Sequence, residues 1–236
     1  MTPSLTAVLI HGAGHTGAIW QRTQAAMRSP SLTVDLPGRG ARPADITRVT
    51  IEQAADSVAT DVRSKVDGDL VLIGHSVAGT VLPSVAARLD GRVRHLVFIA
   101  GITAAQDGHL PMESFLGGQE ERVARRMASF RREHAGATLE DLDVRTSSAI
   151  DSLNFASQPM RWAGVTSTVG RTFIRCLNDP IQPRALQDRL IASCGATEVF
   201  DIESGHTPAE DVPDVLAGIL DGILDALVGD AATSAP

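Results

Sequence analysis

The sequence predicts an α/β fold in which a mostly parallel sheet of about six strands is flanked by helices. Short apolar runs of strand length alternate with stretches of helical periodicity, which is typical of a sheet wrapped by helices. The length of 236 residues suits a single α/β domain with a substantial core, and no internal repeat or long linker divides it. We therefore expect one domain.

Each expected element follows from its local pattern. The expected strands, which are short and rich in aliphatic residues, are 7–10, 32–36, 70–73, 93–100, 171–177 and 197–202. The expected helices are 18–28, 51–66, 77–89, 183–193 and 209–228. The last of these carries its apolar residues on one stripe, so we expect it to pack on the sheet.

One segment breaks the alternation. Residues 106–165 are charged and mostly helical in period, without a convincing strand. We interpret them as a helical insertion over one end of the sheet, so that the core consists of residues 1–105 and 166–228. Five arginines within 122–132 have near-helical spacing and predict a solvated helix face. We expect the tail, residues 229–236, to be disordered.

Charge and composition exclude several partners. The chain has 21 basic and 28 acidic residues and a formal charge of −7, so it offers no electrostatic footprint for nucleic acid or an anionic membrane. Residues 1–12 have no positive leader and only a short apolar run, which favours a cytoplasmic protein. Cys176 and Cys194 fit no metal or redox spacing, so we expect buried free thiols.

A candidate nucleophile follows the third expected strand. That strand runs straight into Gly-His-Ser-Val-Ala-Gly at positions 74–79, and a helix follows. A sharp strand-to-helix turn lifts the hydroxyl of Ser76 clear of the sheet and directs the first helical amides to the same point. Ala78 stands where the commonest form of this elbow has glycine. Glycine-rich turns with serine also occur in other α/β proteins, so the remaining residues decide the interpretation.

A serine hydroxyl is a poor nucleophile at neutral pH and needs a base, which needs an orienting acid. His206 lies between the last expected strand and the terminal helix, where it can reach over the strand ends. Asp179 follows the strand 171–177, and the order Ser76, Asp179, His206 is that of elbow-type hydrolases. Asp107 is the reserve acid. In the alternative interpretation, Asp179 only caps a turn before Pro180.

The proposed chemistry needs donors for a tetrahedral oxyanion. Val77 supplies one backbone amide by following the nucleophile, and Ala13, in the small-residue loop 11–17 after the first strand, supplies the other. These groups predict two-step acyl transfer through an acyl-enzyme, which requires no metal and no organic cofactor.

These motifs resemble the α/β-hydrolase family, in particular the compact subgroup of plant methyl esterases and hydroxynitrile lyases. The matching pieces are His11-Gly12-Ala13 with Trp20 downstream, Asp-Leu-Pro-Gly-Arg-Gly at 35–40, the elbow at Ser76, Asp179 before Ile181 and Pro183, and Gly205-His206. They span nearly the whole chain except the insertion. The resemblance implies that the insertion is a cap that covers the acyl site and determines substrate choice.

The same resemblance separates two reactions. Hydroxynitrile lyases of this type carry threonine where Gly12 stands and a lysine shortly before the catalytic histidine, and segment 201–204 has no lysine. Ester hydrolysis is therefore favoured over cyanohydrin cleavage. We expect a small or medium ester or lactone with a hydrophobic acyl part in an apolar pocket, with packing as the alternative role for the aromatic residues. A carboxylate substrate stays open, because Arg161 or a cap arginine could meet it. The expected substrate-binding residues are Gly12, His15, Trp20, Phe115, Phe155 and Trp162.

Other functions stay open at this point. Gly12, Gly14 and Gly17 after a strand, with Asp35 at the end of the next, form a passable dinucleotide-binding fingerprint. A short-chain dehydrogenase would use a tyrosine for proton transfer, and the chain has none. The same scaffold could instead serve a lyase, a carbon–carbon bond hydrolase, a cyclase or a ligand receptor. A homodimer is also open.

Overall fold

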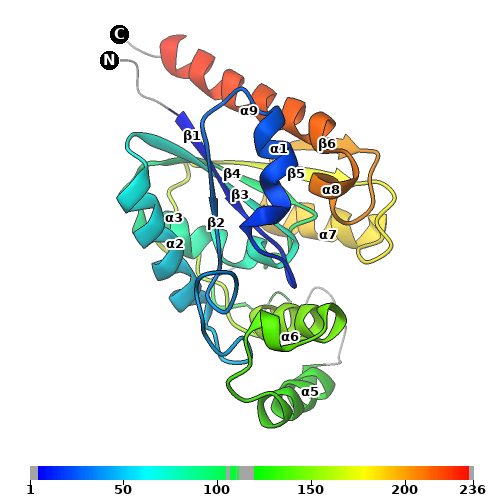
Figure 1. The fold of residues 1–236 in the computed structure, drawn as a ribbon. Helices are drawn as coiled ribbons and strands as arrows, with labels where there is room; N and C mark the ends of the chain where they lie inside the picture. The colour runs from blue at the N-terminus through cyan, green and yellow to red at the C-terminus, as the bar shows by residue number, and fades with distance from the viewer. Residues whose placement is uncertain (1–4, 105–106, 110, 112–119, 234–236) are drawn as a thin grey trace.

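The computed structural model describes residues 5–104, 107–109, 111 and 120–233 (Figure 1). Six parallel strands form one sheet in the order β2-β1-β3-β4-β5-β6. They are β1 (Leu5–Ile10), β2 (Ser31–Val34), β3 (Asp69–His75), β4 (Val93–Ile99), β5 (Gly170–Cys176) and β6 (Glu198–Ile202). The fold class and all expected strands are thereby confirmed, with ends that differ from the expected ones by at most two residues.

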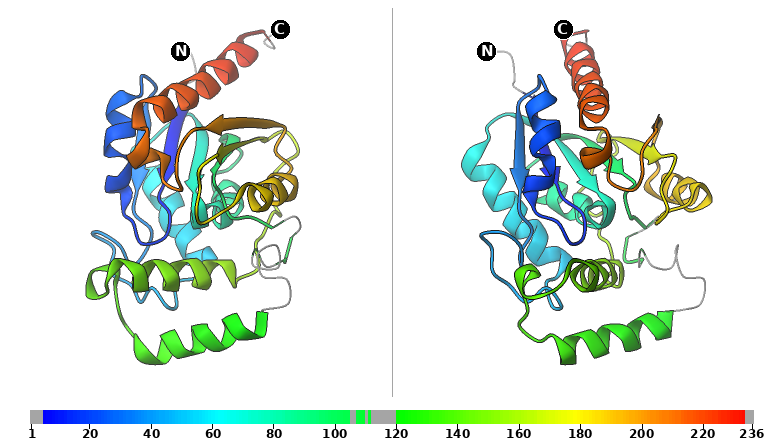
Figure 2. Two further views of the ribbon diagram at one scale, coloured as in Figure 1. Left: turned by 90° about the vertical axis from the view of Figure 1, so that its right-hand side faces the viewer. Right: turned by 45° about the vertical axis from the view of Figure 1, so that its right-hand side comes forward.

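Helices cover both faces of the sheet, as Figure 2 shows from two further sides. On one face lie α2 (Ile51–Lys65), α3 (Leu82–Arg88) and α7 (Arg184–Cys194), and on the other lie α1 (Gln21–Ala26), α8 (Pro208–Asp211) and α9 (Pro213–Thr233). Successive side chains of a strand point to opposite faces, so in β3 Leu70 and Leu72 join the first core while Val71 and Ile73 join the second.

Two helices are shorter than the ranges expected from the sequence, because a 3-10 turn takes up the start of each range. Within 18–28, the 3-10 turn η1 (Gly17–Trp20) precedes α1, and within 77–89 the 3-10 turn η2 (Ser76–Thr80) precedes α3. By contrast, α2 begins where expected, because Thr50 and Gln53 form a capping box that satisfies its first amides.

The expected terminal helix is two helices. Pro213 has no amide hydrogen to continue α8 and disfavours a helical conformation at the residue before it, so α9 starts afresh. Residues 229–233, which belong to the tail expected to be disordered, lie within α9. Within the described ranges, no helix combines the length and hydropathy needed to cross a bilayer.

The described part of the 106–165 segment is helical. It contains α5 (Glu120–Glu133), the 3-10 turn η3 (Leu139–Asp141) and α6 (Val144–Ala156). In Figures 1 and 2 both helices lie beyond one end of the sheet, with α6 nearer to it, and α6 contacts η2 at the carboxyl end of β3. The segment therefore lies at the sheet end from which Ser76 projects.

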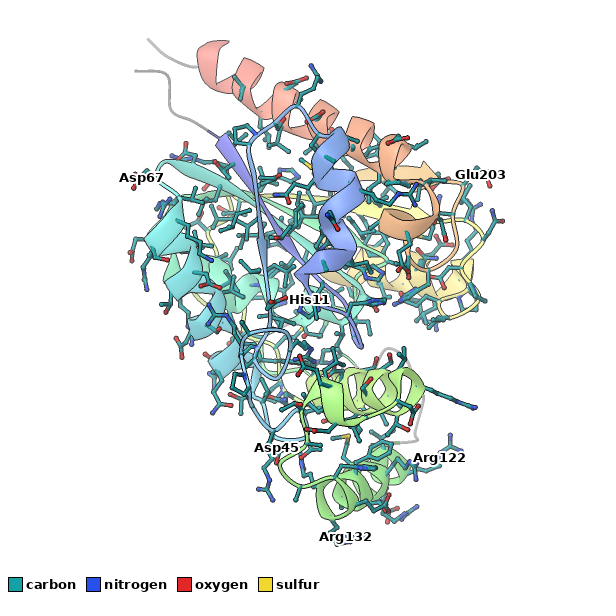
Figure 3. The ribbon with its side chains drawn as sticks, in the orientation of Figure 1. His11, Asp45, Asp67, Arg122, Arg132 and Glu203 are labelled. Carbon is teal, nitrogen blue, oxygen red and sulfur yellow. The ribbon has the colours of Figure 1, made fainter. Side chains whose placement is uncertain are left out.

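The predicted solvated face of α5 is confirmed for four of its five arginines, whereas Arg131 is half-buried and donates to the Thr47 carbonyl at 3.0 Å. Arg122, Arg125, Arg126 and Arg132 are exposed, and Figure 3 shows Arg132 on the side of α5 that faces away from the sheet. The two cysteines are free and buried, as predicted. Burial raises the pKa of Cys176 to about 12 and that of Cys194 to about 11, so both are inert thiols at neutral pH.

Candidate active site

The turn at the end of β3 holds Ser76 in an unusual conformation. Its φ is +51°, a region that L-residues rarely occupy without support from their surroundings. A Cβ on Gly79 would approach the carbonyl oxygen of Ile102 to 2.6 Å, and the Ile102 amide donates to the Ser76 carbonyl at 2.8 Å. Close backbone on both sides thus locks the elbow, while Ala78 fits fully buried at the second glycine position of the motif.

Three distant side chains meet at this turn. The Ser76 hydroxyl lies 2.9 Å from His206 Nε2, and His206 Nδ1 lies 2.6 Å from Asp179 Oδ2. The Asp179 side chain is fully buried and that of His206 is 13% exposed. Because a carboxylate only accepts hydrogen bonds, His206 carries its proton on Nδ1 and presents the Nε2 lone pair to the serine.

The surroundings of Asp179 favour its ionised form. Burial raises the pKa of Asp179, but the hydrogen bond from His206, the backbone amides of Gln182 and Ile181 and the charge of His206 together hold it below its ordinary value. The two amides donate to Oδ1 at 2.9 and 2.7 Å, which leaves Oδ2 for the imidazole. Asp107, the reserve acid, instead accepts from the backbone amide of Trp162 at 2.6 Å.

A second histidine supports the first. His75 Nε2 donates to the backbone carbonyl of His206 at 2.7 Å, and the two ring centroids lie 5.0 Å apart. Burial, followed by the charge of His206, lowers the pKa of His75 to about 3, so it stays neutral and keeps that donor. This role of His75 was not predicted from the sequence, although its place beside Ser76 in the elbow was the available signal.

The loop after β1 crosses close to Ser76. A Cβ on Gly12 would come within 2.6 Å of His75 Nδ1 and 3.2 Å of Ser76 Cβ, so only glycine allows this approach. His11, near the end of β1 (Figure 3), accepts the Leu36 amide at 3.1 Å on Nε2 and anchors the loop. Burial and the nearby charge of Arg39 lower the pKa of His11 to about 3.

The site opens into a cavity of about 320 Å³. Ala13, from the β1 loop, lines it together with Ser76, and Val77 follows the serine as a buried residue of η2. His15 also lines it, as expected of a substrate-binding residue. The complete lining is Ala13, His15, His75, Ser76, Ile102, Ser148, Ser152, Leu153, Ala156, Ile181, Gln182, His206 and Thr207.

Three aromatic residues expected in the pocket lie elsewhere. Trp20 is 1% exposed and packs in the core edge-on to His75. Phe155 is fully buried, because it lies on the core side of α6. The Arg171 guanidinium stacks on Trp162, with Arg171 Cζ 4.4 Å from the centroid of the Trp162 ring. The Trp162 ring nitrogen donates to the Ala104 carbonyl at 3.0 Å. The expectation that they line the pocket is therefore corrected to packing, and Phe115 lies outside the described residues.

The cavity wall contains residues that the sequence analysis missed. Ser148, Ser152 and Leu153 project from α6, and their periodicity alone does not reveal which face of the helix meets the sheet end. Ile181 and Gln182 come from the loop after β5, where their position just beyond Asp179 was a usable signal.

The glycine fingerprint has a structural use in the chain itself. The Gly17 amide donates to Asp35 Oδ1 at 2.7 Å, so the acid expected on a ribose holds the β1 loop instead. That loop enters η1, a short 3-10 turn, whereas a dinucleotide-binding loop opens a full helix.

Comparison with known proteins agrees with this geometry. A family model described as "Alpha/beta hydrolase family" matches residues 7–219. "Probable esterase PIR7A" of Oryza sativa subsp. indica is 31% identical over 116 residues, which cover 46% of this chain and 44% of that protein. A "Pyrethroid hydrolase" of Sphingobium wenxiniae is 22% identical over 253 residues, covering 93% and 87%. The match to the rice esterase spans less than half the length of that protein.

Solved structures show the same fold. An extracellular alpha/beta-hydrolase from a Paenibacillus species superimposes with a TM-score of 0.72 at 20% identity, covering 92% of this chain and 97% of that one. A methylesterase from Arabidopsis superimposes with a TM-score of 0.64 at 18% identity, covering 94% and 99%. The names of the rice protein and the Arabidopsis protein, an esterase and a methylesterase, fall in the class of enzymes that the sequence motifs resemble.

Proposed function

Since this chain belongs to the alpha/beta hydrolase family, we propose that it hydrolyses a small or medium carboxylic ester or lactone through an acyl-enzyme on Ser76. The observation that carries the proposal is the unbroken series of hydrogen bonds from Ser76 through His206 to Asp179, at the floor of a cavity. The similarity to proteins named as esterases and hydrolases supports the same reaction class.

The geometry supports a two-step mechanism. His206 Nε2 takes the proton of Ser76 as its oxygen attacks the acyl carbon, and the amides of Ala13 and Val77 hold the negative oxygen. His206 then gives this proton to the leaving alcohol, and water repeats the cycle on the acyl-enzyme. Asp179 stabilises the imidazolium without taking its proton. Each step uses groups of the chain itself.

The cavity wall favours a neutral substrate with both apolar and polar parts. Ile102, Leu153, Ala156 and Ile181 supply apolar surface, and about 320 Å³ is the lower range for sites that hold small organic molecules. No lysine or arginine is among the described lining residues, and Arg161 pairs with Glu52 at 3.5 Å. A carboxylate substrate is therefore not favoured. We propose that residues 106–165 act as a cap, because the α6 side chains form part of this wall.

A panel of p-nitrophenyl esters and lactones tests the proposal. We expect turnover by the native protein, no turnover by Ser76→Ala, and native turnover by Ser64→Ala, which removes an exposed hydroxyl on α2. Equal hydrolysis by native protein and Ser76→Ala would refute the nucleophile. A receptor or a carbon–carbon lyase on the same scaffold would leave the whole panel unhydrolysed. The absence of a cofactor, the cytoplasmic location and a homodimer stay predictions.

A further inference from the structure

A buried ion pair connects α6 to the loop after β2. The side chains of Asp151 and Arg39 are both completely buried. Arg39 Nε lies 3.1 Å from Asp151 Oδ2, and Arg39 Nη2 contacts Oδ1. The guanidinium also lies over the Phe155 ring, 5.8 Å from its centroid. Neither charged residue lines the cavity or enters the acyl-transfer steps.

A buried ion pair is a weak source of stability, because desolvation offsets most of the attraction between its charges. An apolar pair of the same volume would usually serve the core as well. The geometry around Asp151 indicates a different use. Its Oδ2 atom, besides meeting Arg39, accepts the backbone amide of Gly14 at 3.0 Å.

Gly14 directly follows Ala13, whose amide is the proposed oxyanion donor. Gly14 has φ of +71°, and a Cβ there would collide with the Ser148 hydroxyl. The start of this loop is held by the contact between His11 and the Leu36 amide. Its far end is held by the hydrogen bond from Gly17 to Asp35. The middle, where the donor lies, is held by α6.

We propose that Asp151 is a positioning residue, which holds the Gly14 amide and thereby keeps the adjacent Ala13 amide aimed at the oxyanion. Arg39 fixes the Asp151 carboxylate in the orientation that this hydrogen bond needs. An oxyanion donor must lie about 2.7–3.1 Å from the developing charge, so a small shift of the loop removes its contribution. The inference rests on the proposed acyl transfer and makes α6 part of the catalytic geometry.

Two matched double variants isolate the hydrogen bond to Gly14. Arg39→Met with Asp151→Asn removes both charges and keeps an amide oxygen as acceptor. Arg39→Met with Asp151→Leu removes the same charges and the acceptor, with a side chain of similar size. We expect kcat for p-nitrophenyl butyrate to be about tenfold or more lower in the Leu double variant than in the Asn one, with KM within about twofold. The rate of Ser76 labelling by a fluorophosphonate should fall in parallel.

Equal kcat and equal labelling rates in the two double variants would overturn the inference, and so would a change confined to KM. If the Leu double variant does not fold, Asp151→Glu serves instead, because it keeps the charge opposite Arg39 but moves the acceptor by one methylene. The same loss of kcat is expected, and an unchanged kcat would refute the role. A native protein that takes no label would refute the acyl-transfer proposal and this inference together.

Discussion

At the residue scale, the proposed chemistry depends on how each reacting side chain is restrained. The backbone of Ser76 has a positive φ, and the hydrogen bond from the Ile102 amide holds it in that conformation. His206 is restrained from both sides, since Asp179 binds its ring and His75 binds its carbonyl. Such restraint places the reacting groups before substrate arrives, which is where most of the advantage of an enzyme site originates.

Replacing the acid should separate its role from that of the reserve candidate. We expect Asp179→Asn to lower kcat by about 10³–10⁴-fold with little change in KM, because an amide no longer fixes the imidazole tautomer or stabilises its cation. Steady-state kinetics on a p-nitrophenyl ester measures both constants. Asp107→Asn, which alters the carboxylate that binds the Trp162 and Ala163 amides, is the matched control and should keep native kcat. The reverse ranking would reassign the acid.

The buried histidines make stability depend on pH. The pKa values of His11 and His75 are lowered from 6.5 to about 3, so between these pH values the unfolded chain binds protons that the folded protein excludes. Above pH 6.5 these two histidines therefore do not lower the free energy of unfolding. As the pH decreases from 6.5 toward 3, that free energy falls by about 1.4 kcal/mol per pH unit for each histidine. Urea unfolding at several pH values between 7.5 and 4 gives the free energy of unfolding at each pH. This free energy should fall less steeply with decreasing pH for His11→Gln than for native protein. Identical slopes would contradict this.

At the element scale, α6 presents different side chains to three surroundings. Phe155 packs in the core, Asp151 binds the β1 loop, and Ser148 and Ser152 line the cavity. The hydroxyls of Ser148 and Ser152 form no hydrogen bond to the part of the chain that the structure describes, although helical serines often bond back to the preceding turn. Their hydroxyls are thus available to a polar group of the substrate.

Removing these hydroxyls should change substrate preference. We expect the double variant Ser148→Ala with Ser152→Ala to lower kcat/KM for an ester with a hydroxyl or carbonyl in its acyl chain by about three- to tenfold, the value of a lost neutral hydrogen bond. The matched simple alkyl ester, measured in parallel, should be hydrolysed at the native rate. Equal effects on both esters would show that the serines do not read the substrate.

Asn154 attaches α6 to the segment before α2. Its Nδ2 donates to the carbonyls of Ile46 at 3.2 Å and Val49 at 2.7 Å, and it is buried. We expect Asn154→Ala to lower the free energy of unfolding by about 1–3 kcal/mol, because it leaves two buried carbonyls without this donor. Urea unfolding measures the change, with the exposed Asn178→Ala as a control expected within about 0.5 kcal/mol of native. A native-like Asn154→Ala would show that this attachment is dispensable.

The strands were more predictable than the helices. Buried parallel strands are continuous apolar runs, so β1, β3 and β4 were evident from composition alone. Helix interruptions depend on single residues instead, as Pro213 shows between α8 and α9. The face of α6 that meets the cavity could not be deduced, because its orientation is fixed by contacts with Gly14 and Arg39, which are distant in sequence.

At the scale of the whole molecule, the sheet carries the site. Ser76, Asp179 and His206 follow β3, β5 and β6, and the carboxyl ends of parallel strands meet at the same edge. This rule made the three residues predictable from their positions after apolar runs. His75 and Gln182 were not predicted as supports, although each lies next to a candidate residue in the sequence. The contact of Asp151 with Gly14 could not be predicted, since it arises only when distant segments come together.

The most direct test of the central claim is the rate and position of labelling by a fluorophosphonate, read by mass spectrometry of the digested protein. Attack by the Ser76 oxygen on phosphorus releases fluoride as the serine proton passes to His206. We predict a single label on the peptide that contains Ser76, none in Ser76→Ala, and labelling at least about a hundredfold slower in His206→Gln. A native protein that stays unlabelled, or His206→Gln labelled at the native rate, would contradict the account.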